Sequence, residues 1–292
     1  MGDQREAVLV TGAAGFLGRY CCRALQAEGF EVRALVRDRS KSQDVAADAI
    51  YECDLPEHID EAAFHGSIRA IVHCAYNTRF KTEAESLNTN VEGTKGLLRR
   101  ARAASAAQFV FISSLAAHAG AISLYGRTKH ELEQLFDLER DTVIKPGTIV
   151  GPGGLYARTR EMIGRLPAVP LFYGDRCLQT VWIDDLTEAI VKSIRDRTTG
   201  SFAVAGNSVP MREFYLGTAG LDGRKPLLLP FPGDTILWLL RIIERFGIHT
   251  PISSENLAGL KGLRSFDTTE DLRRLGIRLR SFEESLAALA KS

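Results

Sequence analysis

The segment that decides the fold is VLVTGAAGFLG, residues 8–18. A short apolar run leads into three glycines at positions 12, 15 and 18, and a stretch with helical spacing follows. Glycines in this pattern allow a tight turn after a strand, a close approach of backbone N–H groups to phosphate, and close packing of the next helix on the sheet. The segment therefore predicts a strand, a dinucleotide-binding turn and a helix. We expect the cofactor to contact this turn through Gly12, Ala14, Gly15, Phe16 and Leu17.

Short apolar runs and segments with helical spacing alternate around this turn. The predicted strands are residues 7–10, 32–36, 49–51, 70–73, 109–112 and 143–145. The predicted helices are residues 15–28, 59–64, 83–104, 123–138 and 184–195. Strands joined by helical crossovers form a doubly wound parallel sheet, which binds its ligands at the carboxyl ends of the strands. The sequence therefore predicts an α/β fold of the Rossmann type.

The sequence pattern changes after residue 149: glycines and prolines become frequent, and the predicted elements between them are shorter. We expect residues 1–150 to form the dinucleotide-binding Rossmann domain with the catalytic groups. Residues 151–292 are expected to form mostly a smaller substrate-binding portion, with segments at about 175–205 returning to the Rossmann domain.

Composition narrows the choice of partners and compartment. The net charge of +1 over 292 residues gives no broad basic field of the kind that nucleic-acid or anionic-membrane binding needs. The five cysteines form no C-x-x-C or His-interleaved cluster, so neither a metal site nor a disulfide framework is predicted. No apolar run approaches the ~20 residues of a membrane span, and the polar start of the chain does not resemble a signal peptide. We expect a cytoplasmic protein with a small-molecule substrate. The sequence leaves both a monomer and a homodimer as alternatives.

The residues after the second predicted strand indicate the type of dinucleotide. Val36 ends the strand, so Arg37 is the first side chain that is free to reach the ribose, and Arg39 and Lys41 follow. An arginine at this place matches a 2′-phosphate, whereas a carboxylate accepts from a 2′-hydroxyl. NADP(H) is therefore favoured, and the neighbouring Asp38 leaves NAD as the alternative.

Asp54, followed by Leu55, ends the third predicted strand and has two interpretations. Its carboxylate could accept from the adenine amino group, with Leu55 beside the cofactor. Alternatively, Asp54 could cap the helix predicted to follow it.

Two further motifs carry a family resemblance. Ser113 and Ser114 follow the strand at 109–112, and Tyr125 and Lys129 form a Y-x-x-x-K pattern. With the glycine-rich turn, these motifs make the chain resemble the extended short-chain dehydrogenase/reductase superfamily (the NAD-dependent epimerase/dehydratase family), which includes dihydroflavonol reductases and 3β-hydroxysteroid dehydrogenases. The resemblance covers nearly the whole chain. It includes HCA at 73–75, NVEGT at 90–94, KPGTIVGP at 145–152 and VWIDD at 181–185.

The resemblance implies roles for individual residues. Tyr125 would transfer the proton to or from the substrate oxygen, Lys129 would bind the cofactor ribose, and Ser114 would hold the reacting oxygen, with Ser113 as the alternative. Since residues four apart share a helix face, the Lys129 ammonium should also lower the pKa of Tyr125. Supporting structural roles are implied for His73 and Asn90. The motifs also imply that Cys74, Ala75, Pro146 and Gly147 contact the cofactor.

These features favour an NAD(P)-dependent oxidoreductase that transfers a hydride between nicotinamide C4 and a ketone, an aldehyde or a secondary alcohol. A nucleotide-sugar epimerase is the alternative, and a non-catalytic NADP-binding sensor or assembly protein is a third hypothesis. Leu115 and Ala116 follow the serines where the related sugar dehydratases carry an Asp-Glu pair, which disfavours dehydration.

A late amphipathic segment, residues 235–246, suggests a cover for the substrate. Its apolar face is expected to consist of residues 236, 239, 240, 243 and 246. We expect Trp238 to line an apolar substrate pocket.

Overall fold

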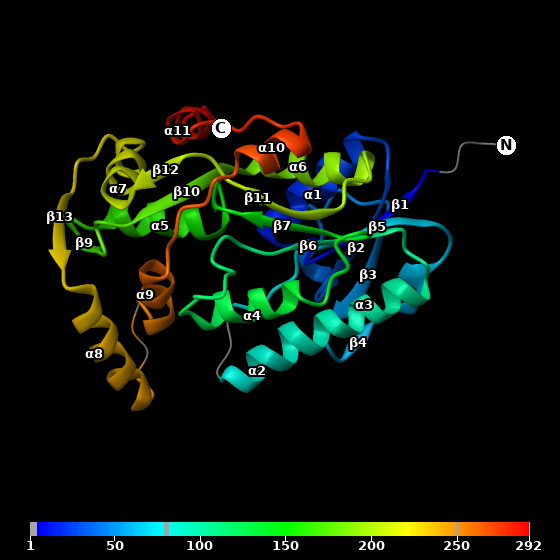
Figure 1. Cartoon of the computed structure of the whole chain (residues 1–292), viewed down its shortest axis with the longest axis horizontal. Coiled ribbons are helices and arrows are strands. Elements are labelled where there is room, and N and C mark those ends of the chain that lie inside the picture. The colour runs from blue at the N-terminus through cyan, green and yellow to red at the C-terminus, as the bar shows by residue number, and fades with distance from the viewer. Residues whose placement is uncertain (1–4, 79–81, 249, 251, 292) are drawn as a thin grey trace.

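The computed structural model describes residues 5–78, 82–248, 250 and 252–291. Its centre is an eight-stranded sheet in the order β11-β7-β6-β5-β1-β2-β3-β4 (Figure 1). Neighbouring strands are parallel except for β4, which is antiparallel to β3. The strands are β1 (Ala7–Thr11), β2 (Glu31–Val36), β3 (Ala49–Asp54), β4 (His58–Ile59), β5 (Ile68–His73), β6 (Gln108–Ile112), β7 (Thr142–Pro146) and β11 (Gly200–Val204). The predicted doubly wound sheet is confirmed.

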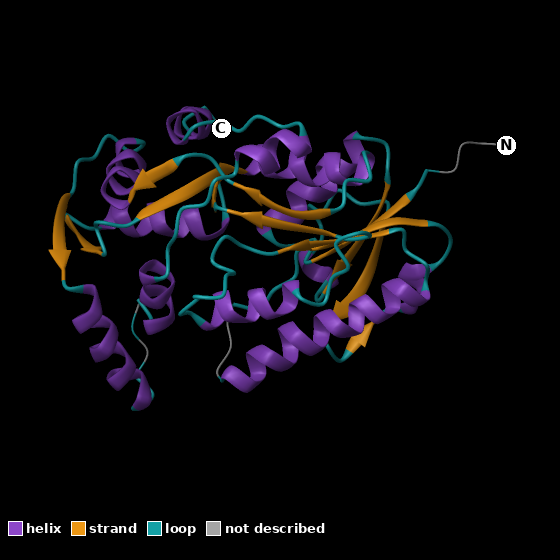
Figure 2. Ribbon diagram, viewed as in Figure 1, coloured by secondary structure: helices purple, strands orange, loops and turns teal. Residues whose placement is uncertain are grey.

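Helices cover both faces of this sheet (Figure 2). One face packs against α1 (Phe16–Ala27), α6 (Ile183–Arg195) and α10 (Thr269–Leu275). The other packs against α3 (Gly93–Ala103) and α4 (Leu124–Glu133). The central strands β1, β5 and β6 are buried on both sides, which explains why they are nearly continuous apolar runs rather than alternating ones.

Two predicted helices differ from the structure. Most of residues 59–64 form only a short 3₁₀ helix, η2 (Glu61–Phe64), because Ile59 pairs with Cys53 in the β3–β4 ladder and Asp60 caps the turn that follows. The predicted helix at 83–104 is a continuous helical stretch made of α2 (Glu83–Leu87), a π-helical turn η3 (Asn88–Glu92) and α3, so only its middle departs from a regular α-helix. The Thr94 hydroxyl, in the first turn of α3, donates to the Asn90 carbonyl within η3 at 2.6 Å. A further short 3₁₀ helix, η1 (Arg39–Lys41), follows β2.

The later part of the chain builds a separate apolar core beside the central sheet. It contains a three-stranded sheet of β12 (Ser208–Pro210), β10 (Cys177–Trp182) and β8 (Thr148–Val150), and a two-stranded sheet of β13 (Leu227–Phe231) and β9 (Ala168–Phe172). Its helices are α5 (Gly154–Arg165), α7 (Met211–Gly220), α8 (Gly233–Arg245), α9 (Ser254–Lys261) and α11 (Phe282–Leu289). No helix among the described residues is long and apolar enough to cross a membrane.

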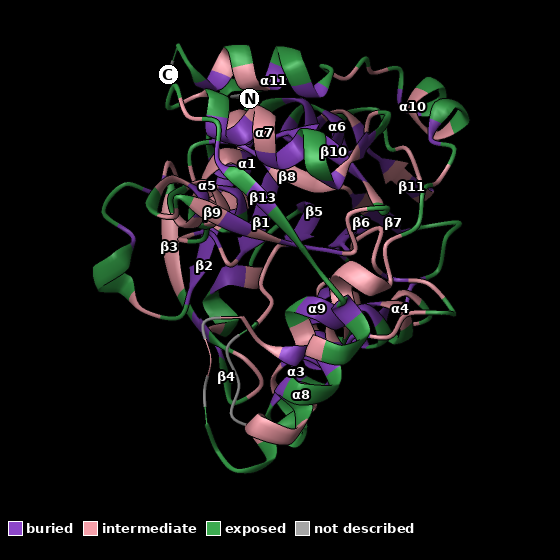
Figure 3. Cartoon of the chain, turned by 90° about the vertical axis from the view of Figure 1, so that its left-hand side faces the viewer, coloured by how far each residue is buried: buried purple, intermediate pink, exposed green. Residues whose placement is uncertain are grey.

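The helix α8 buries a different face from the one predicted. Leu237 and Leu240 are its buried apolar side chains, and they pack with Phe172 and with Leu257 of α9. Much of the surface of α8 is exposed (Figure 3), and Trp238 is 64% exposed, so its place in an apolar substrate pocket stays a prediction. Apolar residues occur almost all around this helix. Its contact with α9 is narrow, so only the residues on one side of the helix are buried.

Candidate active site

The glycine-rich turn forms as predicted and excludes side chains at its centre. Gly12 has a φ of +64°, and a Cβ added there would lie 2.8 Å from the Ala75 nitrogen. A Cβ at Gly18 would lie 2.2 Å from the Gly12 carbonyl oxygen, because α1 starts directly against the end of β1. Any larger residue at either position would push the helix start away from the sheet.

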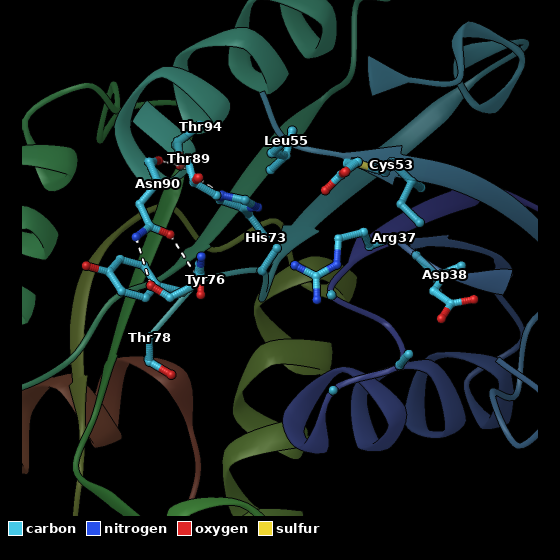
Figure 4. A pocket seen from close by; sticks show the side chains of 18 of the residues that line it. Arg37, Asp38, Cys53, Leu55, His73, Tyr76, Thr78, Thr89, Asn90 and Thr94 are labelled. Carbon is cyan, nitrogen blue, oxygen red and sulfur yellow. Dashed lines mark hydrogen bonds between the residues drawn. The ribbon is translucent and has the colours of Figure 1, made fainter. Parts of the chain in front are cut away.

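A pocket of about 310 Å³ opens beside this turn, at the carboxyl ends of β2, β3 and β5 (Figure 4). Seven of the residues predicted to bind the cofactor line it: Gly12, Ala14, Gly15, Arg37, Asp54, Leu55 and Ala75. Backbone groups at the start of α1 and a basic side chain at the end of β2 suit the phosphates of a dinucleotide. The residues present therefore fit a bound NAD(P).

The other predicted cofactor contacts lie outside this pocket. Phe16 and Leu17 pack into the later core, because the first turn of α1 faces that part of the chain. Cys74 packs against the apolar core on the α1 face of the sheet. Pro146 ends β7, and the Gly147 nitrogen donates to the Val204 carbonyl at 3.1 Å. Lys129, described below, is buried beneath an aromatic ring.

The charged residues at the end of β2 divide into two groups. Arg37 extends toward the middle of the pocket and has no ion-pair partner among the described residues (Figure 4). Asp38 instead caps η1, accepting from the nitrogen and the hydroxyl of Ser40, and these hydrogen bonds hold the pKa of its carboxyl below the usual value. Lys41 lies 3.4 Å from the Asp38 carboxylate. The arginine at this position, rather than the aspartate, is therefore available to contact the ribose of a bound dinucleotide.

Asp54 also lies at the pocket, at the end of β3. The alternative interpretation, that it caps a following helix, is wrong, because the next residues enter β4 and Asp60 supplies the cap of η2. Asp54 and Leu55 both line this pocket.

A buried hydrogen-bond network supports the floor of the pocket. His73 Nδ1 lies 2.6 Å from the Thr11 hydroxyl and Nε2 lies 3.0 Å from the Thr94 hydroxyl. Burial lowers the pKa of His73 to about 3, so its ring is neutral. The Asn90 amide accepts from the Asn77 nitrogen at 2.7 Å and donates to the Asn77 carbonyl at 3.0 Å (Figure 4). Both residues therefore act as structural supports.

The serine, tyrosine and lysine of the two motifs meet between the end of β6 and α4. Tyr125 and Lys129 lie one turn apart on α4, which Ser123 caps by accepting from the Gly126 nitrogen at 3.1 Å. Tyr125 hydrogen-bonds with Ser114. The Ser113 hydroxyl instead donates to Glu133 and is buried. The geometry therefore favours Ser114 over Ser113 as the residue beside the phenol.

The predicted lowering of the Tyr125 pKa is not seen. Burial raises the pKa of Tyr125, and its hydrogen bond with Ser114 opposes this rise only in part. Lys129 does not point at the phenol: its Nζ donates to the Ile112 carbonyl at 2.6 Å and lies 4.4 Å from the centre of the Tyr76 ring. Burial lowers the pKa of Lys129 to about 7.

Tyr76 belongs to none of the motifs noted in the sequence, although this residue joins the pocket to the Tyr125–Lys129 motif. Tyr76 lines the pocket, and its ring stands edge-on to Tyr125 with 5.1 Å between ring centroids. It follows directly after the HCA motif at the end of β5. The sequence feature that could have identified Tyr76 is its position directly after this motif, where an aromatic side chain lies close to the strand end.

Glu133 is a second residue that the sequence analysis missed. Its carboxylate receives the Ser113 hydroxyl on one oxygen and the Lys145 ammonium on the other, at 2.8 Å. Lys145 also donates to the Ala117 carbonyl at 2.8 Å. The network ties α4 to the loop that carries Ser114, so Glu133 positions that loop without facing the pocket.

Comparisons with known proteins agree with this geometry. The model of the NAD-dependent epimerase/dehydratase family matches residues 8–204. A ceramide reductase of Caulobacter vibrioides is 27% identical over 85% of this chain and 80% of its own length. A 3-diazoavenalumate denitrifying reductase of a Streptomyces species is 31% identical over 68% of this chain and 75% of its own length.

Similarity to solved structures supports the fold. MoeE5 in complex with UDP-glucose and NAD has a TM-score of 0.75 at 22% identity, with 98% of this chain and 97% of that chain covered. The family match extends from β1 through β11 and includes the glycine-rich turn, Ser114, Tyr125 and Lys129. The chain belongs to the NAD-dependent epimerase/dehydratase family.

Proposed function

We propose that this protein is an NADP(H)-dependent oxidoreductase that interconverts a ketone or aldehyde with the corresponding alcohol. The observation that carries the proposal is the meeting of Ser114, Tyr125 and Lys129 beside a pocket entered by Arg37. Tyr76 touches both the pocket and the Tyr125–Lys129 pair, so the two halves of the site are continuous.

Each group has a defined chemical task in this proposal. The bound nicotinamide supplies or accepts the hydride. In the reductive direction, Tyr125 donates a proton to the carbonyl oxygen as that oxygen gains negative charge, and Ser114 donates a hydrogen bond to the same oxygen. Lys129 lies one helical turn from Tyr125, and because burial lowers its pKa to about 7 it can exchange protons at neutral pH.

Two observations favour net reduction over epimerisation. An epimerase returns the hydride from one tightly bound cofactor, whereas a reductase exchanges its cofactor at each turnover. Arg37, which has no ion-pair partner in the part of the chain that the structure describes, suits the 2′-phosphate of an exchangeable NADPH. The two curated relatives described above are both named as reductases. We place the protein in the cytoplasm, since its five cysteines are free thiols, and assign substrate binding mostly to residues 151–292.

The test compares two substrate panels. A series of ketones and aldehydes and a series of UDP-sugars are each incubated with NADPH and, separately, with NADH. We expect carbonyl-dependent oxidation of NADPH, followed at the absorbance of the reduced nicotinamide. Epimerisation of a UDP-sugar without net change in cofactor absorbance would contradict the proposal, and so would the absence of turnover in both panels from a protein that binds NADPH.

A further inference from the structure

The helix α8 carries a second apolar face that is largely exposed among the described residues. Trp238, Leu239, Ile242 and Phe246 fall on one side of the helix at about 100° per residue, roughly opposite the buried Leu237 and Leu240. With Ile248, these four side chains form the α8 patch. The exposed fractions are 64% for Trp238, 77% for Phe246, 56% for Ile248 and 43% for Leu239.

The charges at the edge of the α8 patch are positive. Arg241 and Arg245 are exposed beside Trp238 on the helical wheel and have no ion-pair partner among the described residues. The acidic residues of α8 are already engaged. Asp234 pairs with Lys261 at 2.9 Å, and Glu244 accepts from the Ser254 nitrogen at 2.7 Å. An anionic surface laid against this face would meet two arginines without a competing unengaged carboxylate from α8.

The position of α8 makes the patch accessible to a flat surface. The helix forms one extremity of the molecule and packs mainly against α9 (Figures 1 and 3). None of the five side chains of the α8 patch belongs to an apolar core of the described chain.

We propose that the α8 patch docks this protein on an anionic lipid bilayer, with α8 lying in the plane of the interface. A tryptophan, a phenylalanine and aliphatic residues bordered by arginines are the side chains that interfacial helices use: the apolar groups enter the acyl boundary and the guanidinium groups reach the headgroups. The net charge of the chain provides no broad field, so the attraction is confined to this one helix.

A second copy of the chain fits the patch less well. The five side chains offer on the order of 500 Å² of apolar surface, below the ~800 Å² per partner of a standard protein interface. A two-fold contact through this face would also bring Arg241 and Arg245 of one copy against the same arginines of the other. No unengaged carboxylate on α8 would neutralise them.

Vesicle binding tests the proposal without reference to catalysis. The chain has two tryptophans, and Trp182 is already buried with its indole N–H donating to Asp184 at 2.8 Å. A change in emission on addition of vesicles therefore reports mainly on Trp238. We expect a blue shift and co-flotation with vesicles of phosphatidylcholine and phosphatidylglycerol, and much weaker binding to phosphatidylcholine alone.

Variants assign the binding to the patch. A Leu239→Ser/Phe246→Ser double variant should lose flotation on the mixed vesicles. Arg241→Gln and Arg245→Gln should each weaken binding to the anionic vesicles by about fivefold. Leu155→Ser on α5 is the matched control, since Leu155 is 70% exposed and lies outside the patch, and it should bind as the unmodified protein does. Circular dichroism verifies that each variant is folded.

Two results would overturn the proposal. One is the absence of flotation with either vesicle type. The other is self-association in sedimentation velocity that the folded double variant abolishes, in a protein that does not bind vesicles, because the patch would then join two copies of the chain.

Discussion

At the end of β2, the Arg37 guanidinium enters the cofactor pocket while Asp38 is engaged by Ser40. Because charge-assisted hydrogen bonds contribute about 1.5–3 kcal/mol, Arg37→Ala should weaken NADPH binding by about tenfold to a hundredfold and leave NADH binding nearly unchanged. Fluorescence titration of both reduced cofactors measures the two affinities. Equal losses for NADPH and NADH would mean that Arg37 does not contact the 2′-phosphate.

Tyr125 is the residue assigned to proton transfer, and its hydroxyl can be removed without changing the ring. Tyr125→Phe should lower single-turnover reduction by about 10²- to 10⁴-fold, since this is the usual contribution of a general acid. Cofactor affinity should stay within about twofold, because Tyr125 does not line the cofactor pocket. Ser113→Ala is a useful comparison, since that hydroxyl is bound to Glu133. Full activity in Tyr125→Phe would exclude the proposed mechanism.

His73 makes stability depend on pH because it is neutral when folded. Its pKa is about 3 in the folded chain and near 6.5 in an unfolded one, so the unfolded state binds more protons between these values. Stability contributed by the neutral ring is therefore present above pH 6.5 and lost as pH falls, by about 2 kcal/mol at pH 5.

Urea unfolding at pH 7 and pH 5 measures this effect. His73→Gln should be less stable at pH 7 but should lose less stability between the two pH values. The exposed His58→Gln serves as the control. An equally steep decline in His73→Gln would show that other groups cause the acid sensitivity.

At the scale of single elements, α8 offers adjacent residues with opposite environments. Leu237 is 4% exposed, whereas Trp238 is 64% exposed. Leu237→Ala should lower the free energy of unfolding by about 2–4 kcal/mol, because it leaves a cavity against α9. Trp238→Ala should change it by less than about 0.5 kcal/mol. Urea denaturation of the two variants gives both values, and a larger loss for Trp238→Ala would mean that its ring is covered in solution.

The elements around the sheet were predictable because each strand is a compact apolar run between glycines or polar turns. The predicted strand at 32–36 corresponds to β2 with one more residue, and the predicted helix at 184–195 corresponds to α6. The face of α8 was not predictable, since apolar residues surround that helix and only the partner α9 selects Leu237 and Leu240. The π-helical turn at Asn88–Glu92 leaves no mark in the apolar pattern of residues 83–104.

The candidate site divides in the same way. Gly12 and Arg37, whose place depends on local spacing, were correctly predicted to lie at the pocket. Tyr76 and Glu133 were missed because their contacts join segments about 50 and 20 residues apart, which local periodicity does not encode. The pKa of Tyr125 was predicted in the wrong direction, because spacing along a helix does not reveal burial.

At the scale of the whole molecule, the first 150 residues do not contain all of the central sheet. The strand β11 pairs with β7, and α6 packs against α1 with Leu186 and Ile190 fully buried. A fragment of residues 1–150 would leave the β7 edge and the apolar side of α1 open to water. We expect this fragment to aggregate or to lack a cooperative thermal transition in circular dichroism, in contrast to the full chain. Cooperative unfolding of the soluble fragment would show that the later segments are dispensable for the sheet.

The Phe16 ring packs against the glycine run at 151–154, and this contact limits how segments of related proteins can be combined in a chimera. A Cβ added at Gly153 would lie 2.5 Å from this ring, and Cβ atoms added at Gly151 and Gly154 would lie 2.8 Å and 2.7 Å away. The first turn of α1 and the glycine run are thus complementary in shape although about 135 residues separate them. A chimera that takes its amino-terminal half from one relative and its carboxyl-terminal half from another must inherit both surfaces from one parent, or its halves will not seat against each other.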